Sequence, residues 1–349
     1  MKIDFCTGLR EYKSFIKSDD KQFVYICDGK ISSELRKIYG LTQITQESAD
    51  FERIRRILHW TAAHLTHRGD YDNHDPQESL VLLDRYFDRK DAGINCLSLS
   101  IVLAECCLAV GICARVVYMM PREIEDGDNH VVVEAWAGDL GKWIMADPTY
   151  GCFVLDSADT PLSLPELRVA LMENRTVHLS VDAHYNGERD LDQTDILQYY
   201  AKNLFFFRCK LCQCYGAHRE REGIAEIAPD GFDVHTRMVQ NLLFRIAEYG
   251  ESPIFKEWLS FEGALQNQYV NMASFCAPPQ HSKWHRQNKT ALVRLLMELN
   301  TPFTAKQPPD SGGCFISAYL TACHQAPFQS HRSSNAWSLN AHIFYRLTQ

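Results

Sequence analysis

The sequence lacks the features that mark nucleic-acid-binding and membrane proteins. Among its 349 residues there is no Lys/Arg-rich run long enough to form a nucleic-acid footprint, and the formal net charge is −8. No charge-free apolar run is long enough to span a bilayer. Residues 1–6, MKIDFC, are not followed by an apolar segment of signal-peptide length. We therefore expect a cytoplasmic protein with no nucleic-acid or membrane partner.

Cysteine, in contrast, is abundant: the chain has thirteen, an odd number. Because no secretory signal is recognisable, the cysteines are not expected to form a disulfide framework. Cys209, Cys212 and Cys214 lie near His218 with part of the spacing of a zinc site. A second cysteine pair at similar spacing is missing, so we predict neither a metal site nor a cofactor. Zinc found by elemental analysis of the purified protein would overturn this prediction.

The segment Gly93-Ile94-Asn95-Cys96 precedes an apolar stretch with the length of a buried helix. The pattern predicts a helix over residues 97–110, with Asn95 as its N-cap and Gly111 at its end. A thiol at the start of a helix lies near the positive end of the helix dipole, which favours the thiolate. Cys96 is therefore the cysteine whose surroundings suit a nucleophile.

Three extended segments follow this helix. Residues 114–120 predict a buried strand that is rich in valine. Residues 130–136 and 142–147 predict a hairpin joined by a glycine-containing loop. We therefore expect a helix that carries Cys96 to pack on an antiparallel sheet.

The register of the hairpin decides whether two of its polar residues meet. If Trp136 faces Trp143, His130 and Asp147 are diagonal neighbours on one face of the sheet. If the register is shifted by two residues, they face each other directly. A slip by one residue would separate them. Both of the natural registers thus bring His130 and Asp147 together.

A cysteine, a histidine and an aspartate in these positions suit acyl transfer through a thiol nucleophile. The thiolate attacks an amide carbonyl, and a nearby group must later protonate the leaving amine. His130 can serve as this base and acid, and Asp147 can fix the imidazole tautomer and stabilise its charged form. The tetrahedral oxyanion needs hydrogen-bond donors. One is the backbone N–H of Cys96, and the candidates for the second are Trp60, Tyr71 and Asn73.

Other polar residues fit structural roles. A helix with one buried stripe is predicted from Ser48 onward, and His64 and His67 would lie on one face of it. We interpret both as surface or helix-end histidines. Arg115 precedes a buried strand, and we interpret it as one half of a structural salt bridge.

Four segments in this order resemble the transglutaminase-like superfamily. They are GINC (93–96), ARVV (114–117), HVVVE (130–134) and WIMADPT (143–149). The similarity covers about residues 50 to 210, and YYAKNL at 199–204 resembles uncharacterised bacterial members. The resemblance implies a papain-like α+β core in which Cys96, His130 and Asp147 form the catalytic triad.

We predict three regions in the chain: an N-terminal extension over residues 1–45, a transglutaminase-like catalytic core over 46–210, and a C-terminal region over 211–349. Helical periodicity at 233–249 and 288–299 predicts that the last region is mainly helical. The sequence does not reveal the role of this region.

The resemblance leaves the reaction open, because the superfamily includes protein cross-linking acyltransferases, thiol proteases, deglycosylating amidases and inactive binding modules. Strand periodicity shows no flanking β-sandwich domains, so calcium-dependent cross-linking is not expected. We predict acyl transfer on a protein or peptide amide through a Cys96 thioester, resolved by water or by an amine. Hydrolysis is favoured because nothing marks a second substrate site. The alternative is a catalytically inactive module that binds a protein or peptide.

Overall fold

The described part of the chain comprises residues 5–27, 30–46, 48–123, 128–219, 223–234, 236–237 and 268–279 of a computed structural model. All of these residues lie in the first of two units, residues 1–293. The helix expected over 288–299 lies outside the described residues, as does most of the helix expected over 233–249. The helical character predicted for 211–349 can thus be compared with the structure only over a part of that region.

A six-stranded sheet carries the fold, with the strand order β10-β9-β7-β2-β3-β4. Every neighbouring pair is antiparallel except β10 and β9. The central strands β2 and β3 are almost entirely buried, which explains their run of valines. The strands are β2 (Ala114–Met120), β3 (His130–Ala137), β4 (Lys142–Ala146), β7 (Phe206–Lys210), β9 (Ile224–Ile227) and β10 (Gln268–Tyr269).

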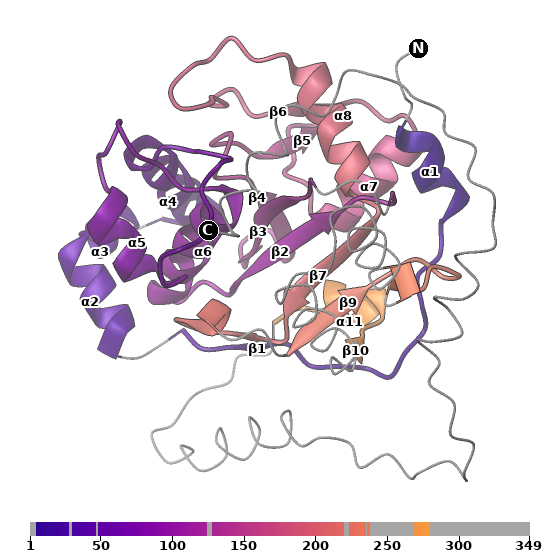
Figure 1. Ribbon diagram of the computed structural model, residues 1–349, viewed down its shortest axis with the longest axis horizontal. Helices are drawn as coiled ribbons and strands as arrows, with labels where there is room; N and C mark the ends of the chain where they lie inside the picture. The colour runs from indigo at the N-terminus through magenta and orange to yellow at the C-terminus, as the bar shows by residue number, and fades with distance from the viewer. Residues whose placement is uncertain are drawn as a thin grey trace, which may run out of the picture. The chain divides into compact units, whose positions relative to one another are not determined.

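Two groups of helices flank this sheet (Figure 1). In the first group, α2 (Lys30–Ile38), α4 (Asp50–His64) and α5 (Ser79–Tyr86) pack around α6 (Cys96–Ala109), which itself lies against β2 and β3. The short α3 (Leu41–Ile44) lies between α2 and α4 in the chain. The second group consists of α1 (Phe5–Glu11), α7 (Leu164–Met172) and α8 (Gln193–Asn203). Two short helical turns, η1 (Ala217–Arg219) and α11 (Met272–Cys276), follow later in the chain.

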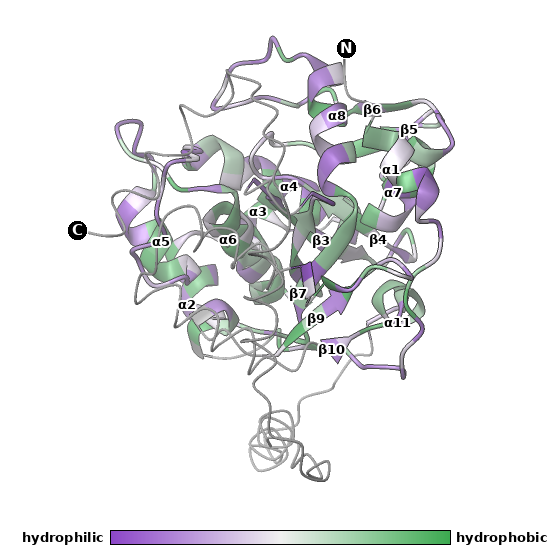
Figure 2. Cartoon of the chain, turned by 45° about the vertical axis from the view of Figure 1, so that its right-hand side comes forward, coloured by the Kyte–Doolittle hydropathy of each residue, from purple (hydrophilic) through white to green (hydrophobic). Residues whose placement is uncertain are grey.

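Helix α6 is the centre of the hydrophobic core. Every residue from Ser98 to Ala109 is buried, so the helix is covered on all sides. Figure 2 shows the same helix and the neighbouring β3 mainly in the colour of hydrophobic residues. Because a helix covered on all sides can neither rotate nor slide without opening cavities, its first residue, Cys96, has a fixed position.

The hairpin of β3 and β4 has the first of the two expected registers. Trp136 is paired with Trp143, and Val133 with Ala146. Asp147 follows β4 directly and therefore lies diagonally across from His130, the first residue of β3. The predicted α+β fold, with the Cys96 helix on an antiparallel sheet, is confirmed.

The described parts of the regions on either side of residues 46–210 make direct contacts with the core. Strand β1 (Val24–Tyr25) pairs with β8 (Cys212–Gln213), and α2 packs on α6. Strands β9 and β10 extend the central sheet well beyond residue 210. These strands have two to four residues, too few to produce a detectable alternation of polar and apolar positions. The described parts of 1–45 and 211–349 therefore belong to the same structure as the core.

The remaining two-stranded sheet pairs β5 (Val154–Asp156) with β6 (Val177–Leu179), between β4 and α8 in the chain. Within the ranges given above, no helix combines the length and the hydrophobicity that crossing a membrane would require.

Candidate active site

Cys96 is the first residue of α6, and Asn95 caps the helix as predicted. The backbone N–H of Ser98 donates to the Asn95 side-chain oxygen at 3.1 Å. This bond satisfies one of the N–H groups that every helix leaves unpaired at its start. The thiol of Cys96 is half-buried at this end of the helix, where the helix dipole favours negative charge.

Gly93 explains how a second segment comes to lie beside Cys96. His67 and Ile94 form a parallel β-bridge, and the N–H of Arg68 donates to the Ile94 carbonyl at 2.9 Å. A Cβ atom at Gly93 would lie 2.7 Å from Cγ of Arg68, and closer still to the carbonyl oxygen of Thr66. Only glycine permits this approach. The close packing brings His67 next to the nucleophile.

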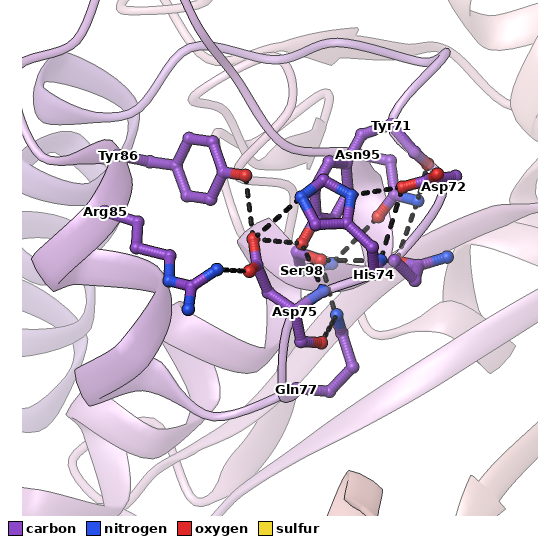
Figure 3. A network of polar contacts seen from close by, with 10 residues as sticks. Tyr71, Asp72, His74, Asp75, Gln77, Arg85, Tyr86, Asn95 and Ser98 are labelled. Atoms are coloured by element: carbon purple, nitrogen blue, oxygen red, sulfur yellow. Dashed lines mark hydrogen bonds and ion pairs between the residues drawn. The ribbon is translucent and has the colours of Figure 1, made fainter.

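The loop before α5 anchors the cap itself. The amide of Asn95 donates to the Tyr71 carbonyl and to the Asn73 side-chain oxygen, both at 3.0 Å. Asn73 has a φ of 59°, in the left-handed region that asparagine tolerates better than most residues. The hydroxyl of Ser98 also donates to Gln77 at 2.8 Å (Figure 3). The cap of α6 is thus fixed from outside the helix.

Asp75 holds this loop in place. Its buried carboxylate accepts hydrogen bonds from the hydroxyls of Tyr71 at 2.9 Å and Tyr86 at 2.7 Å, and it pairs with Arg85 (Figure 3). Tyr86 and Arg85 belong to α5, so the loop is tied to a helix that packs on α6. The ion pair and the hydrogen bonds compensate for the burial of the Asp75 charge.

His130 and Asp147 form a buried pair beside Cys96. Nε2 of His130 donates to Oδ2 of Asp147 at 2.7 Å, which leaves Nδ1 to interact with the thiol. The hydroxyl of Tyr200 in α8 donates to the same carboxylate oxygen at 2.6 Å, and the N–H of Thr149 donates to Oδ1 at 2.8 Å. Asp147 therefore has two hydrogen-bond donors besides His130, and its orientation is fixed.

The electrostatics of these groups favour a thiolate next to an imidazolium. Burial raises the pKa of Cys96, but hydrogen bonds from His130 and His67 outweigh it and lower the pKa to about 6. Burial lowers the pKa of His130, but the Asp147 charge and the contact with Cys96 raise it to about 10. The pKa of Asp147 is below its ordinary value, because His130, Tyr200 and Thr149 together outweigh its burial. Between about pH 6 and 10 the pair therefore holds a single proton, on the imidazole.

His67 is a second histidine that touches the nucleophile. Its side chain is one of the groups that lower the pKa of Cys96, and its Nδ1 lies 3.0 Å from the hydroxyl of Tyr185. Helix α4 ends at His64, so His67 lies on an extended segment beyond the helix. The expectation that His64 and His67 share one face of a helix is therefore wrong, and the interpretation of His67 as a surface or helix-end histidine misses its effect on Cys96. The stripe of buried residues ends at Leu65, directly after the helix.

The three residues considered as second oxyanion donors have other neighbours. The ring of Trp60 packs against Tyr39 and Phe87, with centroid distances of 5.9 and 5.6 Å. The hydroxyl of Tyr71 donates to Asp75, and the side-chain oxygen of Asn73 accepts a hydrogen bond from Asn95. Tyr71 and Asn73 thus support the cap of α6, and His67 is the side chain that contacts the thiol.

Two further expectations concern residues outside the site. Arg115 pairs with Glu134, and both side chains are almost completely buried, which confirms the structural salt bridge. In the sequence cluster with zinc-like spacing, Cys209 is buried in β7, whereas Cys212 and Cys214 hydrogen-bond each other. Among the described residues, no group of three or more His, Cys, Asp or Glu side chains is placed to hold a metal ion.

Two positioning residues were not found by sequence reasoning. Tyr200 lies in the YYAKNL segment, whose helical spacing gives no sign that its hydroxyl reaches Asp147. Tyr185 lies in a turn distant in sequence from His67, and only the folded chain brings the two together. The rings of Tyr150, Tyr199 and Tyr200 lie around the ring of His130. The ring of Tyr185 lies against that of His67.

The comparison with protein families assigns the part of the chain that carries this site. Residues 40–148, which include Cys96, His130 and Asp147, match the family described as the transglutaminase-like superfamily. The match agrees with the four sequence motifs that resemble the same superfamily. A solved structure from Cytophaga hutchinsonii, described as that of a "putative cysteine protease", is 18% identical, with a TM-score of 0.27. The alignment covers 43% of this chain and 43% of that one. No curated protein matches the chain.

Proposed function

We propose that this protein is an enzyme that transfers acyl groups from an amide through a thioester on Cys96. The observation that carries the proposal is the half-buried Cys96 at the start of α6, whose pKa is lowered by His130, which is itself held by the buried Asp147. This geometry supplies a thiolate at neutral pH and an imidazolium that can protonate the leaving amine. The match of residues 40–148 to the transglutaminase-like superfamily supports cysteine-based chemistry.

In this mechanism, the thiolate of Cys96 attacks the carbonyl carbon of a peptide or side-chain amide. His130 then gives its proton to the nitrogen, the C–N bond breaks, and an amine or ammonia leaves. His130, now neutral, takes a proton from the acceptor that resolves the thioester. We favour water as this acceptor, which makes the protein a thiol hydrolase of the protease or amidase type. An amine as acceptor would make it a transamidase. The cytoplasmic location and the protein or peptide substrate stay predictions.

Site-resolved alkylation tests the proposal directly. Wild-type protein is treated with iodoacetamide at pH 6.5, and mass spectrometry measures the labelling of each cysteine. We expect Cys96 to react far faster than Cys276, an exposed cysteine. His130→Ala should abolish this difference, whereas Cys276→Ser should leave Cys96 labelling unchanged. A peptide-library cleavage screen with wild type and Cys96→Ala then measures hydrolysis.

The competing function is a transglutaminase-like module that binds a protein without catalysis. It predicts that Cys96 reacts no faster than an ordinary cysteine and that His130→Ala changes nothing. The reactivity of Cys96 at pH 6.5 therefore separates the two functions before any substrate is known.

A further inference from the structure

Two histidines from different elements contact the sulfur of Cys96, and only one of them belongs to the triad described above. His130 comes from β3, whereas His67 comes from the extended segment that packs against Gly93 and Ile94. The two imidazoles have different second partners. Asp147, a carboxylate, contacts His130, and Tyr185, a phenol, contacts His67. This difference determines what each histidine can do.

A tight turn holds the backbone of His67. The N–H of His67 donates to the side-chain oxygen of Asn186 at 2.8 Å, and the amide of Asn186 donates back to the His67 carbonyl at 3.1 Å. Asn186 and Gly187 have φ values of 52° and 93°, and Tyr185 and Glu188 pair across them. Asn-Gly is the residue pair that such a two-residue turn favours. The same turn therefore supplies both Tyr185 and the two hydrogen bonds of Asn186 that hold the backbone of His67.

The hydroxyl of Tyr185 sets the tautomer of His67. The Tyr185 hydroxyl lies 3.0 Å from Nδ1 of His67, and we assign the phenol as the donor in this hydrogen bond. A neutral imidazole that accepts at Nδ1 carries its proton on Nε2. Nε2–H is then the group that faces the thiol. The contact with Tyr185 orients the His67 ring, and on the opposite side of the ring Nε2–H is the group that can donate a hydrogen bond.

We propose that His67 is the second hydrogen-bond donor of the active site, with Tyr185 and Asn186 as its positioning residues. This inference rests on the proposed function. In the resting enzyme Nε2–H donates to the thiolate. During attack, a sulfur lone pair forms the C–S bond and the carbonyl π electrons move to the oxygen. Nε2–H of His67 and the backbone N–H of Cys96 then donate to the oxyanion. His67 keeps its proton throughout, and His130 supplies the proton for the leaving amine.

The surroundings of His67 do not favour a role as a metal ligand or as a general base. A metal ion between Cys96, His67 and His130 finds no support, because the described residues contain no group of three ligands placed to hold one. A general-base role would need a charged partner for His67, and its partner is the neutral hydroxyl of Tyr185.

The titratable groups around Cys96 allow a clean pH measurement. Besides His67 and His130, the thiol interacts with Tyr118 of β2 and Tyr199 of α8. Desolvation raises the pKa of Tyr118 to about 12 and is also the main cause of the raised pKa of Tyr199. Neither phenol ionises between pH 5 and 9. Changes in the titration of Cys96 over this range therefore report on the two histidines and on Asp147.

The test uses two probes on the full chain. Iodoacetamide reports on the thiolate alone, because its reaction forms no oxyanion. The burst of p-nitrophenolate from p-nitrophenyl acetate, with the Cys96→Ala background subtracted, reports on a step that does form one. The variants are His67→Phe, which removes the donor and keeps a ring, His67→Gln, which keeps an N–H donor, and Tyr185→Phe. His64→Gln is the matched control, because His64 contacts Asp88 at the end of α4.

For His67→Phe we expect the midpoint of Cys96 alkylation to rise by about one to two pH units, the effect of losing one hydrogen bond to a charged group. At pH 8.5, where most of the thiolate is regained, acylation should still fall by about 100-fold. His67→Gln should recover most of this loss. Tyr185→Phe should lower acylation by about two- to tenfold, and His64→Gln should match wild type. If His67→Phe does not fold, as circular dichroism would show, His67→Gln and Tyr185→Phe carry the test.

Two results would overturn the inference. One is a His67→Phe variant whose alkylation midpoint and acylation burst equal those of wild type. The other is an equal loss of alkylation and acylation at pH 8.5, because a displaced thiol, rather than a missing oxyanion donor, would explain it. In both cases the wild type still shows a low alkylation midpoint that depends on His130. If the wild type lacks that low midpoint, the proposed function itself fails, and the two failures are thus distinguishable.

Discussion

Asp147→Asn removes the charge behind His130 while keeping its shape and a hydrogen-bond acceptor. The wild-type carboxylate accepts from Nε2 of His130 at 2.7 Å and from the Tyr200 hydroxyl at 2.6 Å. An asparagine oxygen can still accept from His130, so the ring keeps its orientation. What changes is the electrostatic support of the imidazolium, and hence the range of pH in which thiolate and imidazolium coexist.

The size of the effect follows from the separation of the charges. For unit charges about 4 Å apart, roughly the distance between their delocalised centres, an effective dielectric of 20 gives about 4 kcal/mol. This corresponds to about three pH units. The pKa of His130 is about 10 in the wild type, and the Asp147 charge is the largest of the influences that raise it. We therefore expect this pKa to fall to about 7 in Asp147→Asn, so that the imidazolium is half lost near neutral pH.

The assay is the titration of the His130 ring protons by NMR from pH 5 to 10. In the wild type the imidazolium should persist up to about pH 10. In Asp147→Asn the midpoint of this titration should move down by about three pH units. Tyr200→Phe is the matched control, since it removes a neutral partner of the same carboxylate oxygen and keeps the charge. Coincident profiles for wild type and Asp147→Asn would refute the role of the Asp147 charge.

Two further predictions concern stability. Gly93→Ala should lower the free energy of unfolding in urea by about 1–3 kcal/mol, since the added Cβ has no space against Thr66 and Arg68. Gly8→Ala in α1, where an added Cβ would make only ordinary van der Waals contacts, is its control. Glu134→Gln should cost about 3–5 kcal/mol in the same measurement, because it leaves the buried Arg115 without its counter-charge. A loss below 1 kcal/mol in either variant would contradict the reasoning.

The elements with strong local signals are the ones that the sequence predicts. β2 has the predicted bounds, residues 114–120, and α6 begins at Cys96, one residue before the predicted start. The paired tryptophans Trp136 and Trp143 fix the hairpin register because each covers the other on the same face. Long apolar runs and cross-strand aromatic pairs can be recognised as patterns in the sequence. Strands of two residues, such as β1 and β10, are too short to show a pattern.

The candidate site shows the same division between local and long-range information. The cap by Asn95 and the approach of His130 to Asp147 follow from a helix start and a hairpin, both of which are local. The position of His67 instead depends on a contact with Gly93 and on a turn at Asn186, more than a hundred residues further along. Sequence spacing cannot reveal such a contact, although a glycine directly before a predicted nucleophile is a reason to look for one.

The ionisation of Cys96 and His130 should hardly change the free energy of unfolding of the wild type between pH 6.5 and 9, although it dominates the reactivity of the thiol. The raised pKa of His130 stabilises the fold below pH 6.5, and this stabilisation is lost as the pH rises towards 10. The lowered pKa of Cys96 stabilises the fold above pH 9, and this stabilisation is lost as the pH falls towards 6. Between pH 6.5 and 9 one contribution decreases while the other increases, because folded and unfolded chains hold the same number of protons on the pair.

Cys96→Ala removes the contribution of the thiol to the pH dependence of stability, so that this contribution can be measured by difference. The free energy of unfolding of wild type minus that of Cys96→Ala cancels the titrating groups that do not interact with the thiol, and leaves the contribution of the thiol together with its coupling to His130. Because the folded thiol loses its proton at about pH 6 and the unfolded one near 9, the difference should rise with pH over this interval, by at most about 4 kcal/mol. Urea unfolding at pH 6, 7.5 and 9 measures it. A difference that is the same at all three values would mean that no thiolate is stabilised in the folded protein, and the nucleophile assigned to Cys96 would lose its physical basis.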